Sequence, residues 1–253
     1  MSGPAWLVLP TFNEAANVEG ILRAADAVLR SAAPDGHRIL VVDDSSPDGT
    51  AAIAARVGEE LRTVEVLVRA EREGLGPAYM AGFGHALEGG AAFVMEMDSD
   101  FSHDPADLAR LLDAARSGCD LVLGSRYVPG GGVSDWGRLR RAVSRGGSAY
   151  ARVVLGLAIR DLTGGFKCFR AETLRAIMDP PVRSHGYAFQ VELTYRAAQH
   201  GFRVCEVPIV FRDRQHGDSK MSWRIAAEAM WLVPRLRFGR RGRAAARAAH
   251  VKA

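Results

Sequence analysis

Short apolar runs alternate with longer mixed segments through the first half of the chain. In each run the apolar residues are consecutive, which is typical of strands that are covered on both faces, as in a parallel sheet. The predicted strands are 5–10, 38–43, 64–68, 92–98 and 120–125. The segments between them are long enough for crossover helices, predicted at 14–31, 50–61, 76–88 and 105–117. This alternation predicts an α/β fold with a mostly parallel central sheet flanked by helices, whose ligand crevice lies beyond the carboxyl ends of the strands.

The second half of the chain is less regular. A glycine-rich loop at 128–132 precedes a segment, 136–158, that has the pattern of a helix with a basic start and an apolar continuation. Further helices are predicted at 187–200 and 221–237. Since no repeat or linker divides the chain, we predict one domain over 1–220 and a C-terminal extension over 221–253, made of an amphipathic helix and a basic tail.

The composition is that of a folded domain. With 253 residues, 48% of them hydrophobic, the chain can bury a sizeable core, which argues against disorder. Cys119, Cys168 and Cys205 lie far apart with no CxxC spacing, so we expect neither a zinc site nor a disulfide framework but reduced, buried thiols in a cytosolic setting. The first residues lack the pattern of a signal peptide, and the longest apolar stretches are well short of the ~20 residues that a spanning helix needs.

Carboxylates stand at the strand ends where the crevice is expected. Asp98 and Asp100 follow one another closely, and two such groups repel each other unless a cation or a set of donors offsets the repulsion. Mg²⁺ or Mn²⁺ takes carboxylate oxygens and keeps positions for water and substrate phosphates. Asp43 ends the strand at 38–43 and is the best candidate for a ligand contact there. The sequence therefore predicts an acidic edge of the sheet that is suited to a metal, although acidic strand ends are also common in α/β proteins without one.

Neighbouring aspartates have structural explanations. Asp104 fits a helix N-cap, Pro105 the first helical position and Asp107 the first turn. Asp48 fits a turn that leads into the next helix. We therefore assign these residues to local structure rather than to ligand binding.

Three further positions keep two interpretations each. Glu14 is either a first-turn helix residue or a ribose ligand, with Asn13 or Thr11 as the helix cap. His103 could be a metal ligand, although a lone loop histidine is more often exposed. Ser102 could add an oxygen to the metal or hold a bound water.

Seven motifs in order connect these strand ends to a known family. The chain resembles the family 2 glycosyltransferases with the GT-A nucleotide-diphospho-sugar transferase fold, and within them the polyprenol- or dolichol-phosphate mannose synthase type, over roughly residues 5–225. The motifs are "LPTFNEAANV", "VVDDSSPDGT", "GLGPAYMAGF", "MDSDFSHDP", "GSRYVPGG", "DLTGGFKCFR" and "VPIVFRDRQHGDSKMS". The resemblance implies inverting transfer of mannose from GDP-mannose to the phosphate of a polyprenyl monophosphate lipid.

The resemblance also implies a set of donor-binding residues. Those expected to bind the nucleotide sugar are Pro10, Phe12, Glu14, Val41, Asp43, Asp98, Ser99, Asp100, Arg126, Arg214 and Lys220. The resemblance implies Asp98, Asp100 and Ser102 as ligands of the metal, Mg²⁺ or Mn²⁺. Close relatives often carry glutamine at the position of Ser102. It would act as a Lewis acid and charge clamp.

The positive side of the site follows from the same motifs. Asp100, Arg126, Arg214 and Lys220 are the expected catalytic residues. Arg126 is also predicted independently, because it ends a strand and its planar guanidinium suits phosphate oxygens. Arg140 and Ser144, one helical turn apart, are the implied contacts to the acceptor phosphate.

No general base is nominated, since a phosphate monoester is already anionic near neutral pH. We treat 161–170 mainly as structural, with Asp161 orienting site residues.

Basic and apolar residues together suggest contact with a membrane. The segment at 136–158 fits an interfacial helix, and arginines crowd the C-terminus behind an apolar helix. We expect a cytoplasmic protein attached peripherally to the cytoplasmic face of a membrane, with a membrane-anchoring partner subunit as a further possibility. Nucleic acid is not expected, because no aromatic-basic platform accompanies the tail.

Rival functions are a UDP-glucose-dependent polyprenyl-phosphate transferase, another family 2 glycosyltransferase, and a non-catalytic nucleotide-sugar-binding scaffold. A Rossmann dehydrogenase is disfavoured, because no GxGxxG follows the first strand.

Overall fold

The structure is a computed structural model that describes residues 2–134, 136–182, 188–213 and 233–238. Its strands are β1 (Ala5–Thr11), β2 (His37–Asp43), β3 (Val64–Val68), β4 (Phe93–Glu96), β5 (Leu121–Ser125), β6 (Gly132–Val133), β7 (Lys167–Arg170), β8 (Val204–Pro208) and β9 (Val210–Phe211). Its helices are α1 (Val18–Ala32), α2 (Thr50–Leu61), α3 (Leu75–Glu88), α4 (Asp107–Arg116), α5 (Arg138–Leu155), α6 (Ala171–Met178) and α7 (Ala188–Gln199).

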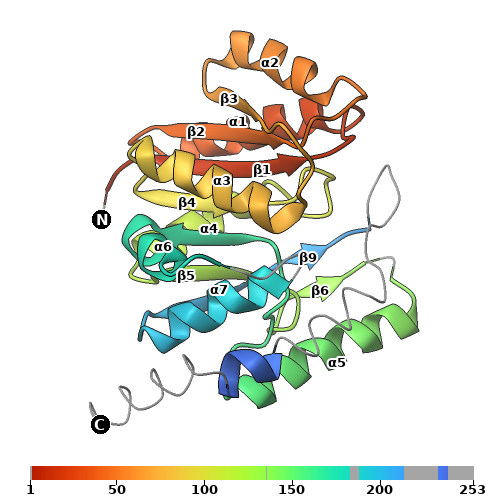
Figure 1. Ribbon diagram of the computed structural model, residues 1–253, viewed down its shortest axis with the longest axis vertical. Helices are drawn as coiled ribbons and strands as arrows, with labels where there is room; N and C mark the ends of the chain where they lie inside the picture. Colours follow the sequence, from red (N-terminus) through yellow and green to blue (C-terminus); the bar gives the residue numbers. More distant parts are fainter. Residues whose placement is uncertain (1, 135, 183–187, 214–232, 239–253) are drawn as a thin grey trace.

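A seven-stranded sheet forms the centre of the molecule, in the order β3-β2-β1-β4-β7-β5-β8 (Figure 1). Only β7 runs antiparallel to its neighbours β4 and β5, while the other pairings are parallel. The predicted α/β class and mostly parallel sheet are therefore confirmed. Strand β7 follows β5 in the sequence but lies between β4 and β5 in the sheet. The regular alternation of parallel strand and helix therefore ends at β5.

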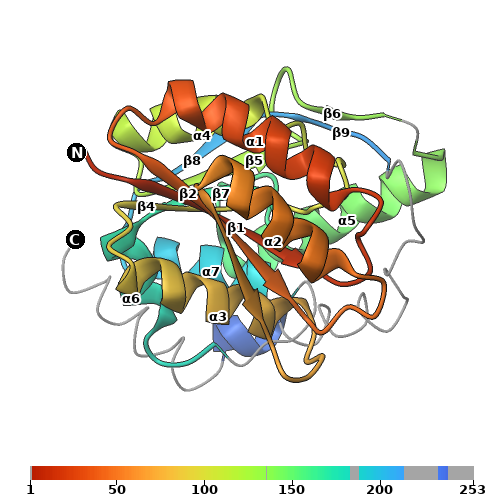
Figure 2. The same cartoon turned by 90° about the horizontal axis from the view of Figure 1, so that it is seen from above.

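Helices cover both faces of this sheet, because its strands are apolar on both sides. Figure 2 shows α1 and α4 on one face and α3, α6 and α7 on the other. One core cluster joins α1, α2 and α4 to residues such as Leu7 and Met95, and the second joins α3, α6 and α7 to residues such as Val8 and Val94. Leu7 and Val8 are adjacent and fully buried, as the consecutive apolar pattern predicts.

The last described strands return the chain to the carboxyl edge of the sheet. After β8, the short strand β9 pairs with β6 in a parallel two-stranded ribbon. The backbone N–H of Arg212 donates to the carbonyl oxygen of Ser102, 3.0 Å away. Helix α5 lies beyond this ribbon, at the opposite end of the molecule from α2 (Figure 1). The segment 209–213 is thereby held against the loop that follows β4.

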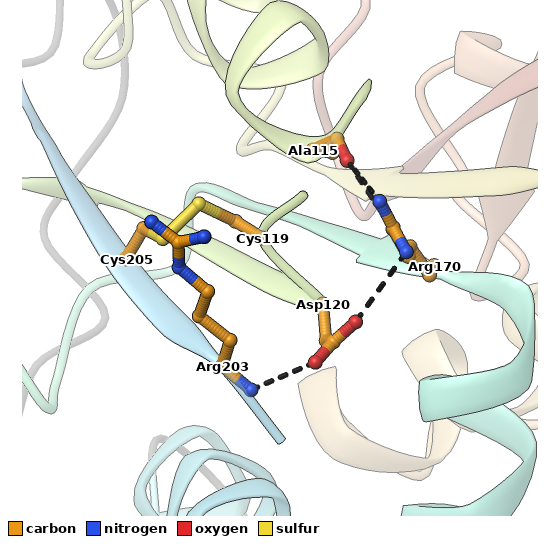
Figure 3. Close-up of a disulfide and its surroundings, with 6 residues drawn as sticks. All are labelled: Ala115, Cys119, Asp120, Arg170, Arg203 and Cys205. Atoms are coloured by element: carbon orange, nitrogen blue, oxygen red, sulfur yellow. Dashed lines mark hydrogen bonds and ion pairs between the residues drawn. A yellow bond between two sulfur atoms is a disulfide. The ribbon is translucent and has the colours of Figure 1, made fainter. Parts of the chain in front are cut away.

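The expectation of three reduced cysteines is wrong. Cys119 and Cys205 form a disulfide with a Cα–Cα distance of 6.0 Å, and only Cys168 is a free, buried thiol (Figure 3). The two cysteines are 86 residues apart in sequence, but β5 and β8 pair in parallel and bring them together. Beside the disulfide, Asp120 accepts a hydrogen bond from the backbone N–H of Arg203, so the edge strand is tied to β5 by covalent and polar contacts (Figure 3).

Several predictions about the C-terminal region concern residues outside those described. Arg214 and Lys220 lie there, as does most of the predicted extension at 221–253. Residues 233–238 are helical, and Val233 packs into the second core cluster. The division at residue 220 stays a prediction. Within the described ranges, no helix is both long and apolar enough to cross a membrane.

Candidate active site

Three strand ends converge where the sequence predicts the crevice. β1 pairs with β2 on one side and with β4 on the other, so the loops that follow them lie side by side at the carboxyl edge. Each of these loops contains a non-glycine residue with positive φ: Asn13 (58°), Ser45 (55°) and Phe101 (61°). Such conformations are costly and are concentrated at functional sites. The sequence contains no direct signal for them.

Asp43 organises the loops after β1 and β2. Its carboxylate accepts hydrogen bonds from Thr11 Oγ1 (2.8 Å), from the backbone N–H of Ser46 (2.8 Å) and from Ser46 Oγ (2.6 Å). Asp43 is fully buried. The side chain that the sequence nominates as a ligand contact therefore also holds the two loops together.

The turn after β2 bears out the structural assignment of Asp48. Its carboxylate accepts from Thr50 Oγ1 (2.6 Å) and from the backbone N–H of Ala15 (3.0 Å), which ties this turn to the loop after β1. Burial alone would raise the pKa of Asp48, but these hydrogen bonds outweigh it and lower the pKa.

Glu14 precedes α1 rather than lying in its first turn. The helix begins at Val18, and neither Asn13 nor Thr11 caps it: the N-cap position is Asn17, whose side chain donates to Glu14 Oε2 (2.9 Å). The backbone N–H of Glu14 donates to Thr50 Oγ1 (2.9 Å), and the side chain is nearly buried. The first-turn interpretation of Glu14 is thus wrong.

The other residues predicted to bind the nucleotide sugar differ in how far they are buried. Val41 is fully buried in the first core cluster, so its side chain packs in the core rather than at an accessible surface. Pro10 is buried, and its carbonyl oxygen accepts from Ser99 Oγ (3.3 Å). Phe12 is partly exposed, and the guanidinium of Arg72 lies over its ring, 3.8 Å from the centroid. Sequence reasoning missed Arg72, because it lies in a loop without a distinctive pattern.

The loop after β4 carries the paired aspartates. Asp100 is 3% exposed, and its Oδ1 accepts the backbone N–H of Ser102 (3.0 Å). Ser102 Oγ is buried without a hydrogen-bond partner. A buried oxygen without a partner, in a loop that also carries two aspartates, suits an oxygen-liganded divalent cation, so Asp98, Asp100 and Ser102 fit the predicted metal.

This loop supplies few side chains that could bind a metal. Among the described residues, no group of three or more histidine, cysteine, aspartate or glutamate side chains is arranged to hold a metal ion. Substrate oxygens and water would therefore have to complete the coordination sphere, as is usual for Mg²⁺.

The expectation that His103 is exposed is wrong. It is 2% exposed and packs between Phe166 and Phe211, with ring centroids 5.0 and 5.1 Å away. Burial lowers the pKa of His103 to about 4, although the charge of Asp100 opposes that shift. The ring is therefore neutral near pH 7. Its Nδ1 accepts a long hydrogen bond of 3.4 Å from the backbone N–H of Asp98. The imidazole therefore contacts the backbone of the acidic loop.

The predicted start of α4 is wrong in detail: the N-cap position is Ala106 rather than Asp104, and no side chain caps the helix. Asp104 Oδ1 accepts the backbone N–H of Ala106 (3.0 Å), and the helix begins at Asp107, two residues later than the predicted start. Asp107 lies in the first turn and pairs with Arg110 (2.6 Å).

Arg126 lies just after β5 and is held by Asp161. Nε and Nη2 each donate to one carboxylate oxygen over 2.7 Å, and the backbone N–H of Arg126 donates to Asp161 Oδ2 over 2.9 Å. The side chains are 8% and 0% exposed. Burial alone would raise the pKa of Asp161, but the charge and hydrogen bonds of Arg126 outweigh it and lower the pKa. The orienting role predicted for Asp161 is consistent with this geometry.

The predicted acceptor residues lie on α5 near Arg126. Ser144 Oγ is 2.6 Å from the hydroxyl of Tyr127, the residue after Arg126. Arg140 pairs with Asp213 at 3.1 Å, and its guanidinium lies 4.3 Å from the ring centroid of Trp136. Arg140 and Ser144 thus face a region between α5 and the ends of β5 and β9.

A buried ion pair beneath the acidic loop was missed. Glu96 on β4 and Lys167 on β7 are fully buried and 3.4 Å apart, and Lys167 Nζ also donates to the carbonyl oxygen of Gln190 (3.1 Å). Burial raises the pKa of Glu96 and lowers that of Lys167. The sequence did contain a signal for this pair, since Glu96 is a lone glutamate inside an otherwise apolar run and a buried carboxylate needs a partner.

Comparisons with known proteins fit this arrangement. The model of the family "Glycosyl transferase family 2" matches residues 6–178. The undecaprenyl-phosphate mannosyltransferase of Micrococcus luteus is 46% identical over 228 residues, which are 90% of this chain and 91% of the relative. The polyprenol monophosphomannose synthase of Mycolicibacterium smegmatis is 45% identical over 238 residues, which are 94% of this chain and 87% of the relative.

A solved structure supports the fold. Glucosyl-3-phosphoglycerate synthase from Mycobacterium tuberculosis, in complex with Mn²⁺, uridine diphosphate and phosphoglyceric acid, superimposes with a TM-score of 0.70 at 19% identity. The match covers 94% of this chain and 79% of that chain. A structure of the same enzyme with Mg²⁺ and uridine diphosphate matches with a TM-score of 0.64 at 19% identity, covering 90% of this chain and 77% of that one.

The α/β fold and its acidic strand ends define a sugar-transferring enzyme of the GT-A type. The chain belongs to glycosyl transferase family 2.

Proposed function

We propose that this protein transfers mannose from GDP-mannose to the phosphate of a polyprenyl monophosphate, with inversion at the sugar carbon. The observation that carries the proposal is the similarity, at 46 and 45% identity over almost the whole chain, to two relatives named for mannose transfer to a polyprenyl phosphate. The arrangement of charge supports it: the acidic loop with Asp98 and Asp100 follows β4, and Arg126 follows β5, which runs in the same direction on the other side of β7.

Different residues would bind the sugar donor and the lipid acceptor. The loops organised by Asp43 and Asp48 would receive the nucleotide, and Arg126 would contact the diphosphate. Arg140 and Ser144 would hold the acceptor phosphate. A phosphate monoester carries between one and two negative charges near neutral pH, so it can attack the sugar carbon without a protein base. Positioning and electrostatic stabilisation are then the main contributions of the protein.

A divalent cation is part of the proposal. Asp98, Asp100 and Ser102 would hold it, and the unpartnered hydroxyl of Ser102 supports that assignment. When bound, such a cation neutralises the charge that develops on the departing diphosphate. The relative from Mycobacterium tuberculosis was solved with Mn²⁺ and with Mg²⁺.

The acceptor lipid suggests a location at a membrane surface, on its cytoplasmic face. Helix α5 exposes Leu139 (79%) and Val143 (58%), and the exposed arginines Arg138 and Arg145 flank them. Apolar residues bordered by cations suit the interface of an anionic bilayer. Because Ser144 lies on the same helix, this placement would bring the acceptor site to the lipid headgroups.

A lipid-extraction assay tests the enzymatic proposal. The protein is incubated with Mg²⁺ or Mn²⁺, a polyprenyl monophosphate, and either GDP-mannose or UDP-glucose carrying a radiolabelled sugar. We expect label in the organic phase only with GDP-mannose, and none when the unphosphorylated polyprenol replaces the acceptor. Label from UDP-glucose alone would reassign the donor, and no glycolipid under any metal condition would contradict the proposal.

A further inference from the structure

The indole of Trp136 carries a buried hydrogen-bond donor that the structure leaves unused. The residue is 8% exposed, and its Nε1 is buried without a hydrogen-bond partner. The indole N–H can only donate a hydrogen bond, so only an acceptor atom can pair with it. Buried donors without a partner are rare in folded proteins and call for an explanation.

Two guanidinium groups lie near the indole ring of Trp136. The guanidinium of Arg140 lies 4.3 Å from the centroid of the Trp136 ring, and that of Arg126 lies 5.9 Å from it. Phe211 of β9 packs edge-on against the ring at a centroid distance of 5.3 Å. Trp136 therefore lies close to both the arginine proposed for the diphosphate and the arginine proposed for the acceptor phosphate.

This environment selects the kind of atom that could accept from Nε1. An oxygen that approaches a donor near two guanidinium groups is favoured when it is anionic, and phosphate oxygens meet that condition. Arg140 and Asp213 are 37 and 42% exposed, so their ion pair lies in partial contact with solvent and leaves the guanidinium accessible to a second anion. Arg126, in contrast, is already bound through two nitrogens by Asp161.

We propose that the Nε1–H of Trp136 donates a hydrogen bond to a phosphate oxygen of the acceptor, as a third ligand beside Arg140 and Ser144. The inference rests on the proposed function. Trp136 lies closer to Arg140 than to Arg126, and it lies two positions before Arg138, the first residue of the helix that carries Ser144. The acceptor phosphate is therefore the occupant, rather than the diphosphate of the donor.

The wild-type protein allows a direct test, because it contains four tryptophans and so four indole N–H signals in a ¹H–¹⁵N spectrum. The signal missing from Trp136→Phe assigns Trp136. Farnesyl phosphate serves as a soluble acceptor, farnesol as the matched ligand without phosphate, and GDP as the donor-side ligand. We expect the Trp136 proton to move downfield with farnesyl phosphate and to stay in place with the other two.

The outcomes separate this inference from the proposed function. A Trp136 signal that stays in place while other signals respond to farnesyl phosphate overturns the inference and leaves the function standing. An equal response to farnesol, or a downfield shift with GDP alone, also overturns it. If no signal responds to farnesyl phosphate and no glycolipid forms in the extraction assay, both fail.

Kinetics provide a second measurement with a matched control. Trp136→Phe keeps an aromatic face for Arg140 and removes only the donor, whereas Trp6→Phe makes the same change at a 5% exposed tryptophan on β1, where it packs against His85. We expect Trp136→Phe to lower kcat/KM for the acceptor about 10- to 100-fold, the effect of one hydrogen bond to a charged group. KM for GDP-mannose should change less than about twofold. An equal loss in both variants would indicate a general packing effect and overturn the inference.

Discussion

Arg126 and Asp161 form a bidentate ion pair in which both side chains are almost completely buried. Asp161 accepts from Nε, Nη2 and the backbone N–H of Arg126, so it determines where the guanidinium and the end of β5 lie. A planar group held in this way suits a diphosphate, because it loses little conformational freedom on binding.

Replacing Asp161 with Asn tests that relationship. The change keeps the size of the side chain but leaves the buried guanidinium without its counter-ion, which typically costs about 3–5 kcal/mol of folding stability. We expect a lower midpoint in urea unfolding and a reduced kcat. The matched control is Glu60→Gln, which breaks an exposed, solvent-screened pair with Arg23 and should change the unfolding midpoint much less. Equal stability of the two variants would show that Asp161 does not hold Arg126.

The same pair predicts a dependence on pH. Because Asp161 has a lowered pKa in the folded state, its contribution to stability is present above the unfolded pKa of about 3.9. That contribution is lost as the pH falls through the lower folded pKa. Asp161→Asn should therefore remove part of the acid sensitivity of the wild-type protein, measured by unfolding between pH 2 and 5.

The acidic loop offers a test with two neighbouring aspartates. Asp100→Asn removes a charge where the cation would bind, and it should lower kcat at least about 100-fold and abolish the response to added Mg²⁺ or Mn²⁺. Asp104→Asn, four positions later in the sequence, keeps an oxygen that can accept from Ala106, so its activity should stay within about twofold. Chelation should inactivate the wild type reversibly. Similar activity in both variants would remove Asp100 from the metal site.

Local patterns were sufficient for most of the fold. Runs of apolar residues predicted the strands β1 to β5 to within two residues, because a strand that is buried on both faces cannot include many polar positions. Asp104 and Asp107 predicted the start of α4 to within two residues, since helix starts are determined by nearby residues, although the N-cap position is Ala106 rather than Asp104.

Properties that depend on distant segments could not be predicted in this way. Phe166 and Phe211, which bury His103, come from the β7 and β9 regions, and the position of neither follows from the sequence around residue 103. The disulfide depends likewise on the pairing of β5 with β8. The acidic loop itself was predictable, because two nearby carboxylates at a strand end need a partner whatever surrounds them.

Exposed apolar residues on α5 lead to a prediction about membranes. The double variant Leu139→Glu/Val143→Glu should bind vesicles that contain anionic phospholipid at least about tenfold more weakly, because two apolar contacts are lost and two repulsive charges are gained. Val68→Glu, at an exposed valine on the edge strand β3, should bind like the wild type. Co-sedimentation measures this difference. Unchanged binding of the α5 variant would exclude this face as the contact surface.

Reduction of the Cys119–Cys205 disulfide should destabilise the protein. A bridge that closes a loop of 86 residues restricts the unfolded chain and typically contributes about 2–4 kcal/mol. A lower melting temperature, by roughly 5–15 °C, is therefore expected when a reductant is added. Cys119→Ala/Cys205→Ala should melt at the lower temperature with or without reductant, whereas Cys168→Ala should retain the response. If reductant does not change the melting temperature of the oxidised wild type, the disulfide contributes no stability.

His103 should make folding stability depend on pH in a weakly acidic range. Its pKa is about 4 in the folded protein and about 6.5 in an unfolded chain, so the unfolded state binds more protons between these values. Stability should be greatest above pH 6.5 and should fall by about 2 kcal/mol on going to pH 5, since one pKa unit corresponds to 1.36 kcal/mol. His103→Gln should flatten this dependence, while His200→Gln, at an exposed position, should leave it unchanged. Urea unfolding in metal-free buffer at both pH values measures the difference, and an unchanged slope in His103→Gln would mean that the imidazole is not kept neutral by its aromatic surroundings.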